Sequence, residues 1–349
     1  MTASQHTPLF ILNRGETDES IHFGSIAISD AHGNLLYAAG NPYIVTFLRS
    51  TAKPFQALPF IEAGGPEHFG LTEREIALLC ASHSGTDEHV AVAAAIQHKI
   101  GVGEGDLMCG THYPYHEETA ERLKAAGQAP SPNRHNCSGK HSGMLAFALL
   151  KQAPIADYIA FEHPVQQAIL RTFAEMCSLP IEDVALGVDG CSAPNFAVPL
   201  YNAAWAYARL CDPHDLPNRR AAACRTITHA MTTHPDMVGG PGRFDTALMQ
   251  VSNGQIVSKA GAEGYQGIGL RPGALGPDSP ALGIALKISD GDLRKSIRPA
   301  VVLEILRQLG ALNAEQQQSL VAFGPQFPIY NWRKLTVGRG RPAFTLQTP

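Results

Sequence analysis

The chain has 349 residues, of which 44% are hydrophobic and 17% are charged, and its formal net charge is −4. This composition excludes a disordered chain and leaves enough apolar mass for one large domain or two closely joined ones. The chain lacks the basic excess that binds nucleic acid or an anionic membrane surface, and no run reaches the roughly 18 apolar residues of a membrane span. Seven scattered cysteines argue against a disulfide framework, and the N-terminus has no secretory signal pattern, so we expect a cytoplasmic protein.

The predicted elements run from strands through helices and back to strands. A β-hairpin is expected over residues 26–37 and a short strand over 44–48. The pattern Thr72-Glu73-Arg74-Glu75 predicts a capped helix start. The further predicted helices lie at 86–97, 117–126, 142–151, 164–176, 203–210, 219–231 and 293–309. The further predicted strands lie at 184–188, 255–258, 283–289 and 332–337, and an Asn253-Gly254 turn precedes the strand at 255–258.

This order of elements predicts an α+β fold with a mostly antiparallel sheet built from both chain ends. We expect a single catalytic unit over residues 1–349. Its sheet lobe is predicted at about 1–50 and 245–349, and its helical lobe at about 51–244.

The segment Ser50-Thr51-Ala52-Lys53 has the spacing that places two side chains on one face of a helical turn. A serine hydroxyl is a poor nucleophile unless a neighbour accepts its proton, and a lysine amine can do so only when uncharged. Because the ordinary pKa of lysine is about 10.4, such a site must lower that pKa by about 3 units through burial or a neighbouring cation. Taken alone, the motif also fits a capping serine and a solvated lysine at a strand-to-helix junction.

Two further segments follow in the chain order of serine β-lactamases and penicillin-binding proteins, which carry S-x-x-K, a second serine element and K-T-G on a strand. Here the segments are Ala81-Ser82-His83-Ser84-Gly85 and Lys259-Ala260-Gly261. Histidine follows the second serine and alanine replaces the threonine of K-T-G, so the pattern indicates serine-dependent carbonyl chemistry and does not favour a β-lactam substrate. Each segment alone also fits an ordinary helix end or strand end.

Two cysteines lie in polar segments separated by about fifty residues. Cys137 follows Asn136 in a loop that leads to Lys140, and Cys191 lies two residues after Asp189 at the end of a predicted strand. Two thiols with histidines nearby suggest a soft metal such as zinc, although the spacing is not that of a zinc finger. Burial of both cysteines as small hydrophobic side chains is the alternative.

Together these segments resemble the asparaginase II family, the rhizobial-type L-asparaginases. The resemblance runs along nearly the whole chain and rests on five segments in one order: Arg49-Ser50-Thr51-Ala52-Lys53-Pro54-Phe55-Gln56-Ala57, Ala81 to Gly85, Asn136 to Gly143, Asp189 to Pro194, and Lys259 to Gly264.

The resemblance implies hydrolysis of the side-chain amide of L-asparagine to L-aspartate and ammonia, in a fold similar to serine β-lactamases and serine-dependent glutaminases. It implies two Ser–Lys tandems, Ser50 with Lys53 and Ser82 with Lys259. It also implies a homodimer and a zinc ion with water in its fourth position. By position the metal ligands are Cys137, Lys140 and Cys191, and the substrate-binding residues are Arg49, His83 and Asp189.

Other functions remain open at this point. A serine-dependent glutaminase or a β-lactam amidase of the same fold would use the same serines. A zinc-hydroxide amidohydrolase would use the metal instead and leave Ser50 structural. A non-enzymatic amino-acid-binding protein is the third alternative. In every case the expected partner is a small molecule, with no nucleic acid and no membrane.

Overall fold

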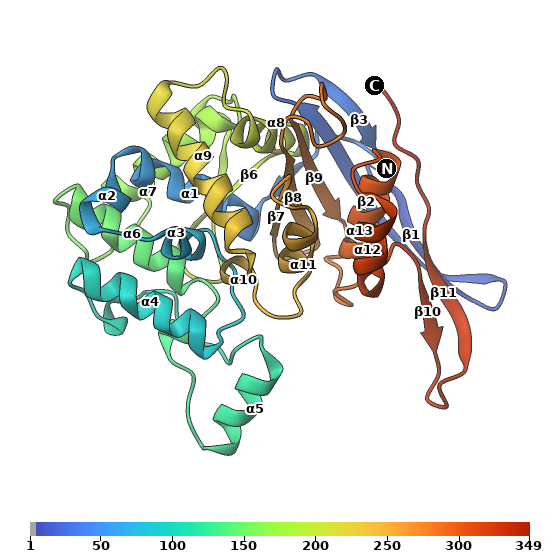
Figure 1. Cartoon of the computed structure of the whole chain (residues 1–349), viewed down its shortest axis with the longest axis horizontal. Helices are drawn as coiled ribbons and strands as arrows, with labels where there is room; N and C mark the ends of the chain where they lie inside the picture. The colour runs from blue at the N-terminus through green and yellow to red at the C-terminus, as the bar shows by residue number, and fades with distance from the viewer. Residues whose placement is uncertain (1–4) are drawn as a thin grey trace. The chain divides into compact units, whose positions relative to one another are not determined.

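The computed structural model describes residues 5–349, so the first four residues, on which part of the N-terminal signal expectation falls, lie outside the described residues. The chain divides into two compact units (Figure 1). The sheet unit comprises the residues up to Arg49 together with Val198–Asp212 and Val251–Pro349. The helical unit comprises Ser50–Ala197 and Pro213–Gln250. Residues 198–212, expected in the helical lobe from the sequence, therefore belong with the sheet.

The sheet unit is built on one eight-stranded sheet in the order β10-β11-β1-β2-β9-β8-β7, with β3 paired to β2. All its described pairings are antiparallel. The strands of this unit are β1 (Thr7–Arg14), β2 (Thr17–Asp30), β3 (Leu35–Ala39), β4 (Val45–Phe47), β7 (Ile256–Ala260), β8 (Tyr265–Leu270), β9 (Leu282–Ile288), β10 (Phe327–Tyr330) and β11 (Thr336–Pro342). Because both chain ends contribute strands to this sheet, the predicted α+β class with an antiparallel sheet is confirmed.

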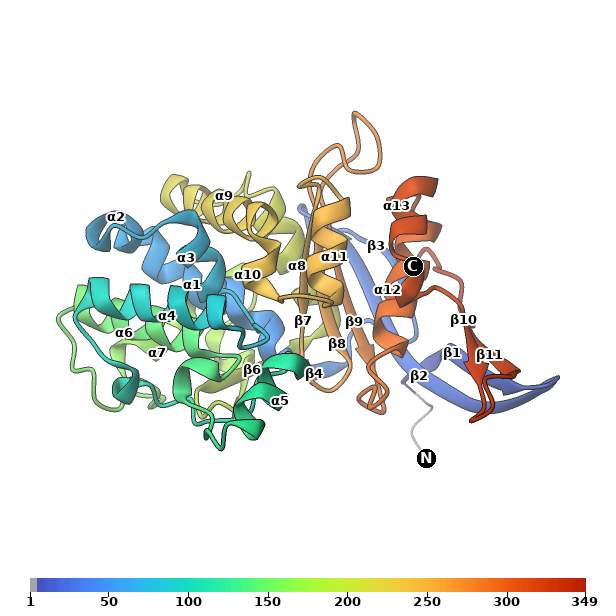
Figure 2. The same ribbon diagram turned by 60° about the horizontal axis from the view of Figure 1, so that its bottom comes forward.

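Helices cover the sheet on two sides. Figure 2 shows β8 and β9 between α8 (Leu200–Cys211) and α12 (Ile297–Gln308), and α13 (Ala314–Ser319) follows α12. Helix α8 approaches β9 so closely that a Cβ atom on Gly283 would lie 1.8 Å from the carbonyl oxygen of Ala204. Only glycine fits at this position, because any side chain would force the helix away from the sheet.

The helical unit has two buried helices at its centre, α1 (Lys53–Glu62) and α6 (Ser138–Leu150). Helix α1 packs against α6, α7 (Pro164–Met176) and α9 (Asn218–Thr233). The remaining elements are α2 (Gly65–Phe69), α3 (Glu73–Leu79), α4 (Asp87–Ile100), α5 (Glu117–Ala125), α10 (Pro235–Val238), α11 (Phe244–Val251, whose last residue is in the sheet unit), β5 (Ala185–Val188) and β6 (Pro194–Pro199). Within residues 5–349, every helix is too short or too polar to span a lipid bilayer.

Local signals in the sequence set several of these boundaries. Thr72 and Glu75 form the predicted capping box at the start of α3, and Thr86 caps α4. Pro164 occupies the first turn of α7, which ends at Met176 as predicted. The hairpin of β2 and β3 pairs Ile26 with Ala39, which confirms the first predicted hairpin.

Three predicted boundaries were wrong. Helix α6 begins at Ser138, four residues before the expected start, and α12 begins at Ile297 instead of Leu293. The segment 332–335, expected in a strand, belongs to the turn between β10 and β11, where the Asn331 side chain accepts hydrogen bonds from backbone N–H groups. The predicted Asn253-Gly254 turn is present, since both residues have positive φ angles and strand β7 follows them.

Candidate active site

Ser50 and Lys53 lie three residues apart on one helical path, which a 3-10 turn and helix α1 form together. Ser50 is half-buried in a 3-10 turn, Arg49–Ala52, and Lys53 is the first residue of α1. Proline is accommodated at position 54 because the backbone N–H groups in the first turn of a helix have no partner within the helix. Side chains three residues apart on a helical path share a face, and the contact of the Ser50 hydroxyl with the Lys53 amine that this spacing predicts stays a prediction.

The amine of Lys53 is buried and contacts a second serine. Lys53 is 1% exposed, and its Nζ atom lies 2.5 Å from the carbonyl oxygen of Ala81 and 3.4 Å from that of Asn136. The third contact is with the Ser82 Oγ atom at 2.9 Å. The first two predicted serine elements therefore meet at one buried amine.

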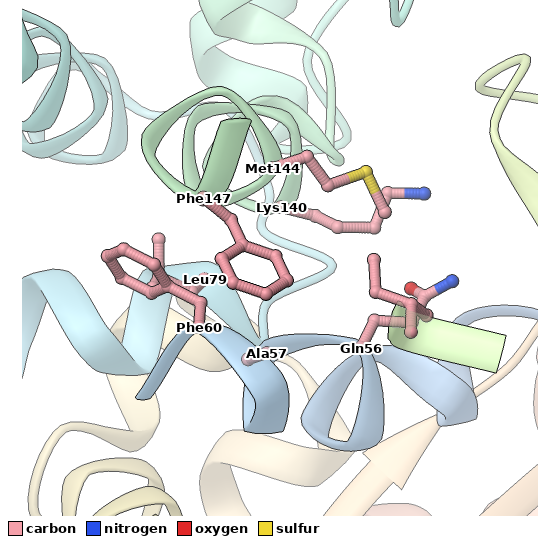
Figure 3. A pocket seen from close by; sticks show the side chains of 9 residues that line it. Gln56, Ala57, Phe60, Leu79, Lys140, Met144 and Phe147 are labelled. Carbon is pink, nitrogen blue, oxygen red and sulfur yellow. The ribbon is translucent and has the colours of Figure 1, made fainter. Parts of the chain in front are cut away.

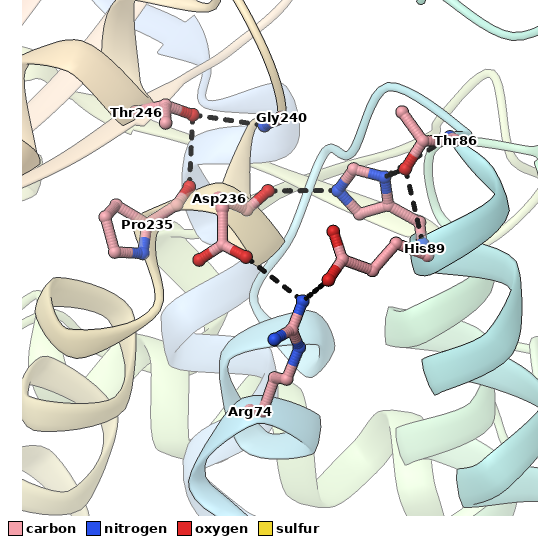
Figure 4. Close-up of polar contacts among 8 residues, drawn as sticks. Arg74, Thr86, His89, Pro235, Asp236, Gly240 and Thr246 are labelled. Carbon is pink, nitrogen blue, oxygen red and sulfur yellow. Dashed lines mark hydrogen bonds and ion pairs between the residues drawn. The ribbon is translucent and has the colours of Figure 1, made fainter. Parts of the chain in front are cut away.

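The loop that carries Ser82 is held by backbone contacts to the segment 235–240. The Ser82 N–H group donates to the Val238 carbonyl at 3.0 Å, and the Ser84 hydroxyl donates to the Gly239 carbonyl at 2.8 Å. Figure 4 shows the same segment held from its other side, where Asp236 contacts the His89 ring and Thr246 binds Gly240. Of these contacts, the backbone hydrogen bond of Ser82 itself to Val238 fixes the position of Ser82.

His83 supports this loop from the interior. Its ring is fully buried, its Nδ1 atom accepts a hydrogen bond from the Gly85 N–H group at 3.1 Å, and its Nε2–H donates to the Ser138 hydroxyl at 2.8 Å. Burial is the main reason that the pKa of His83 lies well below its ordinary value, so the ring is neutral. Since both ring nitrogens bind protein groups, the ring acts as a support, and a substrate contact by His83 stays a prediction.

The two thiols and the lysine of the predicted metal site form one buried cluster. Cys137 precedes α6, Lys140 lies in its first turn, and Cys191 lies in the loop between β5 and β6. All three are less than 5% exposed. The Lys140 Nζ atom donates to the Cys191 sulfur at 2.8 Å, and Cys137 hydrogen-bonds to Cys191.

The electrostatics of this cluster favour a thiolate beside a cation. The hydrogen bond from Cys191 is the main reason that the pKa of the Cys137 thiol lies well below its ordinary value. Burial alone would lower the pKa of Lys140, but the sulfurs of Cys191 and Cys137 outweigh it and raise that pKa. Among residues 5–349, no three His, Cys, Asp or Glu side chains form a metal-holding group. Two sulfurs and one amine form a different donor set, and its chemistry suits a soft divalent cation.

Asp189 lies at the rim of this cluster. A tight turn joins it to Cys191, since the Asp189 N–H donates to the Ala193 carbonyl and its own carbonyl accepts from the Ser192 N–H, both at 2.9 Å. Asp189 is half-buried, whereas Cys191 is buried, so the turn directs the thiol inward and leaves the carboxylate nearer to solvent. The negative charge of Asp189 also contributes to the raised pKa of Lys140.

Two predicted site residues belong to the sheet unit. Lys259 lies in β7 with no solvent exposure, and its Nζ atom donates to the Ala260 carbonyl at 2.7 Å. Arg49 is 3.9 Å from the carboxylate of Glu263. The tandem of Ser82 with Lys259 and the substrate contact of Arg49 stay predictions.

Comparison with known families gives a match over nearly the whole chain. The model of the L-asparaginase II family matches residues 11–342. The chain belongs to the L-asparaginase II family. It is therefore an amidohydrolase by family, and the five segments from Ser50 to Lys259 lie within the matched range.

Solved structures similar to this family member include two enzymes named as glutaminases. The Bacillus subtilis glutaminase YbgJ in covalent complex with 5-oxo-L-norleucine is 12% identical, with 83% of this chain and 89% of that chain covered and a TM-score of 0.38. A Bacillus glutaminase in concentrated NaCl is 12% identical over 82% and 91% of the chains, with a TM-score of 0.38. Mglu in its native form is 14% identical over 84% and 66%, with a TM-score of 0.40. No curated protein matches the sequence.

A small apolar cavity lies behind the thiol cluster of this family member, lined in part by the Lys140 stem (Figure 3). The cavity has room for about one water molecule, so it cannot hold an amino-acid substrate. The lining residues are Gln56, Ala57, Phe60, Leu79, Lys140, Gly143, Met144, Phe147 and Ile169. The stem of Lys140 therefore borders an apolar space, while its amine donates to the Cys191 sulfur.

Sequence reasoning missed the groups that hold the site together. The carbonyls of Ala81 and Asn136, which bind Lys53, leave no trace in residue type. Ser138 and His141 stand in the segment Asn136 to Gly143, but the sequence indicated no role for them, because their partners His83 and Tyr158 are distant in sequence.

Proposed function

We propose that this amidohydrolase acts on L-asparagine and releases L-aspartate and ammonia, with Ser50 as nucleophile and Lys53 as its base. The main support is the buried Lys53 amine, which lies one helical turn after Ser50 and 2.9 Å from the hydroxyl oxygen of Ser82. Family membership supports the reaction class. The asparagine specificity rests on the family resemblance of the five segments.

In the first half-reaction, the Ser50 hydroxyl attacks the side-chain amide carbon and its proton passes to the uncharged amine of Lys53. A C–O bond forms and the amide C–N bond then breaks. The departing nitrogen receives a proton and leaves as ammonia, which leaves a β-aspartyl ester on Ser50. The hydrogen bond from Lys53 to Ser82 supplies a path for that proton.

In the second half-reaction, water attacks the ester carbon and the C–O bond to Ser50 breaks. Ser82 with Lys259 takes the proton from the attacking water, and this proton passes through the Ser82–Lys53 hydrogen bond to the departing Ser50 oxygen. Lys259 is a buried amine at the end of β7, where its Nζ donates to the Ala260 carbonyl, a setting that a proton-transferring lysine requires.

We also propose that Cys137, Lys140 and Cys191 hold a zinc ion. Two thiolates and an amine with an open fourth position form a donor set of the catalytic type. A bound zinc ion would supply positive charge that orients the substrate. Lys140 now donates to the Cys191 sulfur at 2.8 Å, so it must lose a proton and turn its lone pair to the metal. Asp189, whose charge acts on Lys140, would orient the ligands or the substrate.

A homodimer and a cytoplasmic location complete the proposal. Both derive from the sequence: the dimer from the family resemblance and the location from the scattered cysteines. Light scattering coupled to size-exclusion chromatography tests the dimer, since a mass near the 37.3 kDa of one chain would contradict it.

Ammonia release by the Ser50→Ala variant tests the proposed function. The variant should bind asparagine and release no ammonia, because alanine has no attacking oxygen. Ser84→Ala is the matched control, since Ser84 is a buried serine of another segment whose hydroxyl donates to the Gly239 carbonyl. Parallel assays with glutamine and a chromogenic β-lactam compare the alternatives. Full turnover by Ser50→Ala, lost on complete chelation, would favour zinc-hydroxide hydrolysis.

A further inference from the structure

The turn between β7 and β8 follows directly after Lys259 and is held by a cationic side chain that the proposed reaction does not use. The guanidinium of Arg298, the second residue of α12, donates to the Gly261 carbonyl at 2.8 Å. Gly261 is buried, so its carbonyl needs a donor from the protein. The preceding carbonyl, that of Ala260, accepts from the Lys259 amine at 2.7 Å. Arg298 and Lys259 therefore bind two consecutive carbonyls of one short segment.

The peptide unit between Ala260 and Gly261 connects the two contacts. Its carbonyl binds the Lys259 amine, and its N–H group donates to the Tyr265 carbonyl at 2.9 Å. Because peptide units are planar, only the φ and ψ angles of Gly261 lie between this unit and the carbonyl that Arg298 holds. Glycine is free at both angles, so the hydrogen bonds set the conformation here. Loss of the Arg298 contact therefore lets the Gly261 carbonyl rotate, together with the peptide unit that directs the Lys259 amine.

The rest of this turn also depends on contacts from outside it. Glu263 has a φ of 55° and Gly264 a φ of 67°, and the first of these is a left-handed conformation that a residue with a side chain rarely adopts. Such a conformation persists only where the surrounding structure holds it. The Lys287 amine, from β9, donates to the Glu263 carbonyl. Two cationic side chains from neighbouring elements thus hold the turn that follows Lys259.

The base of the Arg298 side chain is itself fixed by a buried carboxylate. Asp292, which is 5% exposed, accepts hydrogen bonds from the N–H groups of Ile297 at 3.1 Å and Arg298 at 2.9 Å. A carboxylate in this place satisfies the first backbone donors of α12 and is favoured by the positive end of the helix dipole. The N–H group of Asp292 donates in turn to the Asp290 carboxylate at 2.9 Å. The guanidinium therefore reaches Gly261 from a fixed backbone position.

We propose that Arg298 is a positioning residue for Lys259: through the Gly261 carbonyl it holds the segment that orients the Lys259 amine for release of the β-aspartyl ester. The inference rests on the role proposed for Lys259 in the second half-reaction. Arg298 exchanges no proton itself, since a guanidinium stays protonated in proteins. Its effect on the reaction passes through Lys259 alone.

Loss of Arg298 should therefore slow only the second half-reaction. Displacement of a reacting group by about 1 Å can cost about 100-fold in rate, so Arg298→Met should slow hydrolysis of the ester by about 10-fold or more. The attack of Ser50 on asparagine should proceed as in the parent protein. The ester should accumulate and kcat and KM should fall together, whereas kcat/KM, which reports only the steps up to ammonia release, should keep its parent value.

The test combines steady-state ammonia release with an acid quench of the full-length protein at saturating asparagine. Intact-protein mass spectrometry then gives the share of the enzyme that carries the ester, and Arg298→Met should raise this share. Arg307→Met is the matched control: Arg307 lies on the same helix and its guanidinium binds Glu304, so its loss should leave the ester share and kcat unchanged. The double variant with Lys259→Met should lose no more activity than Lys259→Met alone, because Arg298 acts through Lys259.

A parent-like ester share and kcat in a folded Arg298→Met protein would overturn the inference, and so would a full further loss of activity in the double variant. If Arg298→Met fails to fold, Arg298→Gln decides by the same two readouts, because this half-buried position accepts a polar side chain that is shorter than arginine. A parent-like kcat in Lys259→Met would remove the proposed role of Lys259 and this inference with it. The serine nucleophile is tested separately, by the ammonia assay of Ser50→Ala.

Discussion

The Lys53 amine lies 2.9 Å from the hydroxyl oxygen of Ser82, a residue 29 positions further along the chain. The sequence spacing associates this lysine with Ser50, three residues before it. An uncharged amine can donate its two N–H groups to the carbonyls of Ala81 and Asn136 and keep its lone pair for a hydroxyl proton. The structure therefore gives this lysine a contact with Ser82, and its proton exchange with Ser50 belongs to the proposed reaction.

Replacement of Ser82 by alanine should lower kcat by about 100-fold or more, because the proton path from Lys53 to the leaving group is interrupted. KM for asparagine should change much less, since the nucleophile Ser50 is intact. Steady-state ammonia release measures both constants. Ser84→Ala, from the same loop, should keep nearly full activity; an equal loss in both variants would show that the loop conformation, and not the Ser82 hydroxyl, had been disturbed.

Replacement of Lys53 by methionine should abolish ammonia release and also reduce stability. Methionine fills similar space, but the carbonyls of Ala81 and Asn136 lose their donor inside the protein. An unsatisfied buried group costs about 1–3 kcal/mol, so the free energy of unfolding should fall by about that amount. Urea unfolding followed by circular dichroism measures it. Measurable turnover in a folded Lys53→Met protein would remove Lys53 from the mechanism.

Two stacked histidines predict acid sensitivity of the fold. The rings of His83 and His89 lie 4.8 Å apart, and burial is the main reason that both pKa values lie below the ordinary 6.5. The charges that further lower the pKa of His83 are those of His89, Lys53, His135 and His112. The unfolded chain binds these protons more readily than the folded one. Stability is therefore complete above about pH 6.5 and declines as the pH falls toward the folded-state values.

The slope of this decline can approach about 1.4 kcal/mol per pH unit for each histidine. Urea unfolding between pH 7.5 and about pH 5 measures it. The His89→Gln variant, which removes one titrating ring, should show a shallower slope than the parent protein. A free energy of unfolding that stays constant from pH 7.5 to 5, or an identical slope in His89→Gln, would contradict this account.

How much the sequence could predict depended on whether the signal was local. The capping box of Thr72 with Glu75 and the proline that starts α7 act within one helical turn, and both were predicted correctly. The start of α6 was missed because Gly139 looks like a loop residue. In the structure this glycine is required by packing, since a Cβ atom there would lie 2.2 Å from the Leu78 carbonyl oxygen on α3.

The same distinction between local and distant contacts applies to the candidate site. The sequence placed Ser50 and Lys53 on one turn, and it associated Cys137, Lys140 and Cys191 through the family resemblance; the structure brings the last three together. The hydrogen bond of Lys53 to Ser82 depends on how α1 packs beside the loop after α3, which residue spacing does not encode. The carbonyl groups around Lys53 were equally invisible, because every residue carries one.

The contact of Gly139 with Leu78 predicts a graded series of glycine substitutions. Gly139→Ala should destabilise the protein by about 1–3 kcal/mol, the usual cost of overpacking, and should weaken zinc binding because it displaces the turn that carries Lys140. Gly143→Ala, with its nearest contact at 3.1 Å to the Leu79 side chain, should cost less. Gly105→Ala, which meets open space, is the control. Urea unfolding ranks the three, and equal stability of Gly139→Ala and Gly105→Ala would contradict the packing argument.

The covalent intermediate offers the most direct measurement of the central claim, that the hydroxyl of Ser50 attacks the amide carbon of asparagine. Rapid mixing of the Lys259→Met variant with asparagine, an acid quench and peptide mass spectrometry would locate any ester, because Lys259 acts only in the proposed second half-reaction and its loss should make the acyl-enzyme accumulate. The account predicts a β-aspartyl group on the peptide that contains Ser50. An ester on another residue, or complete turnover with no ester formed at any time, would contradict it.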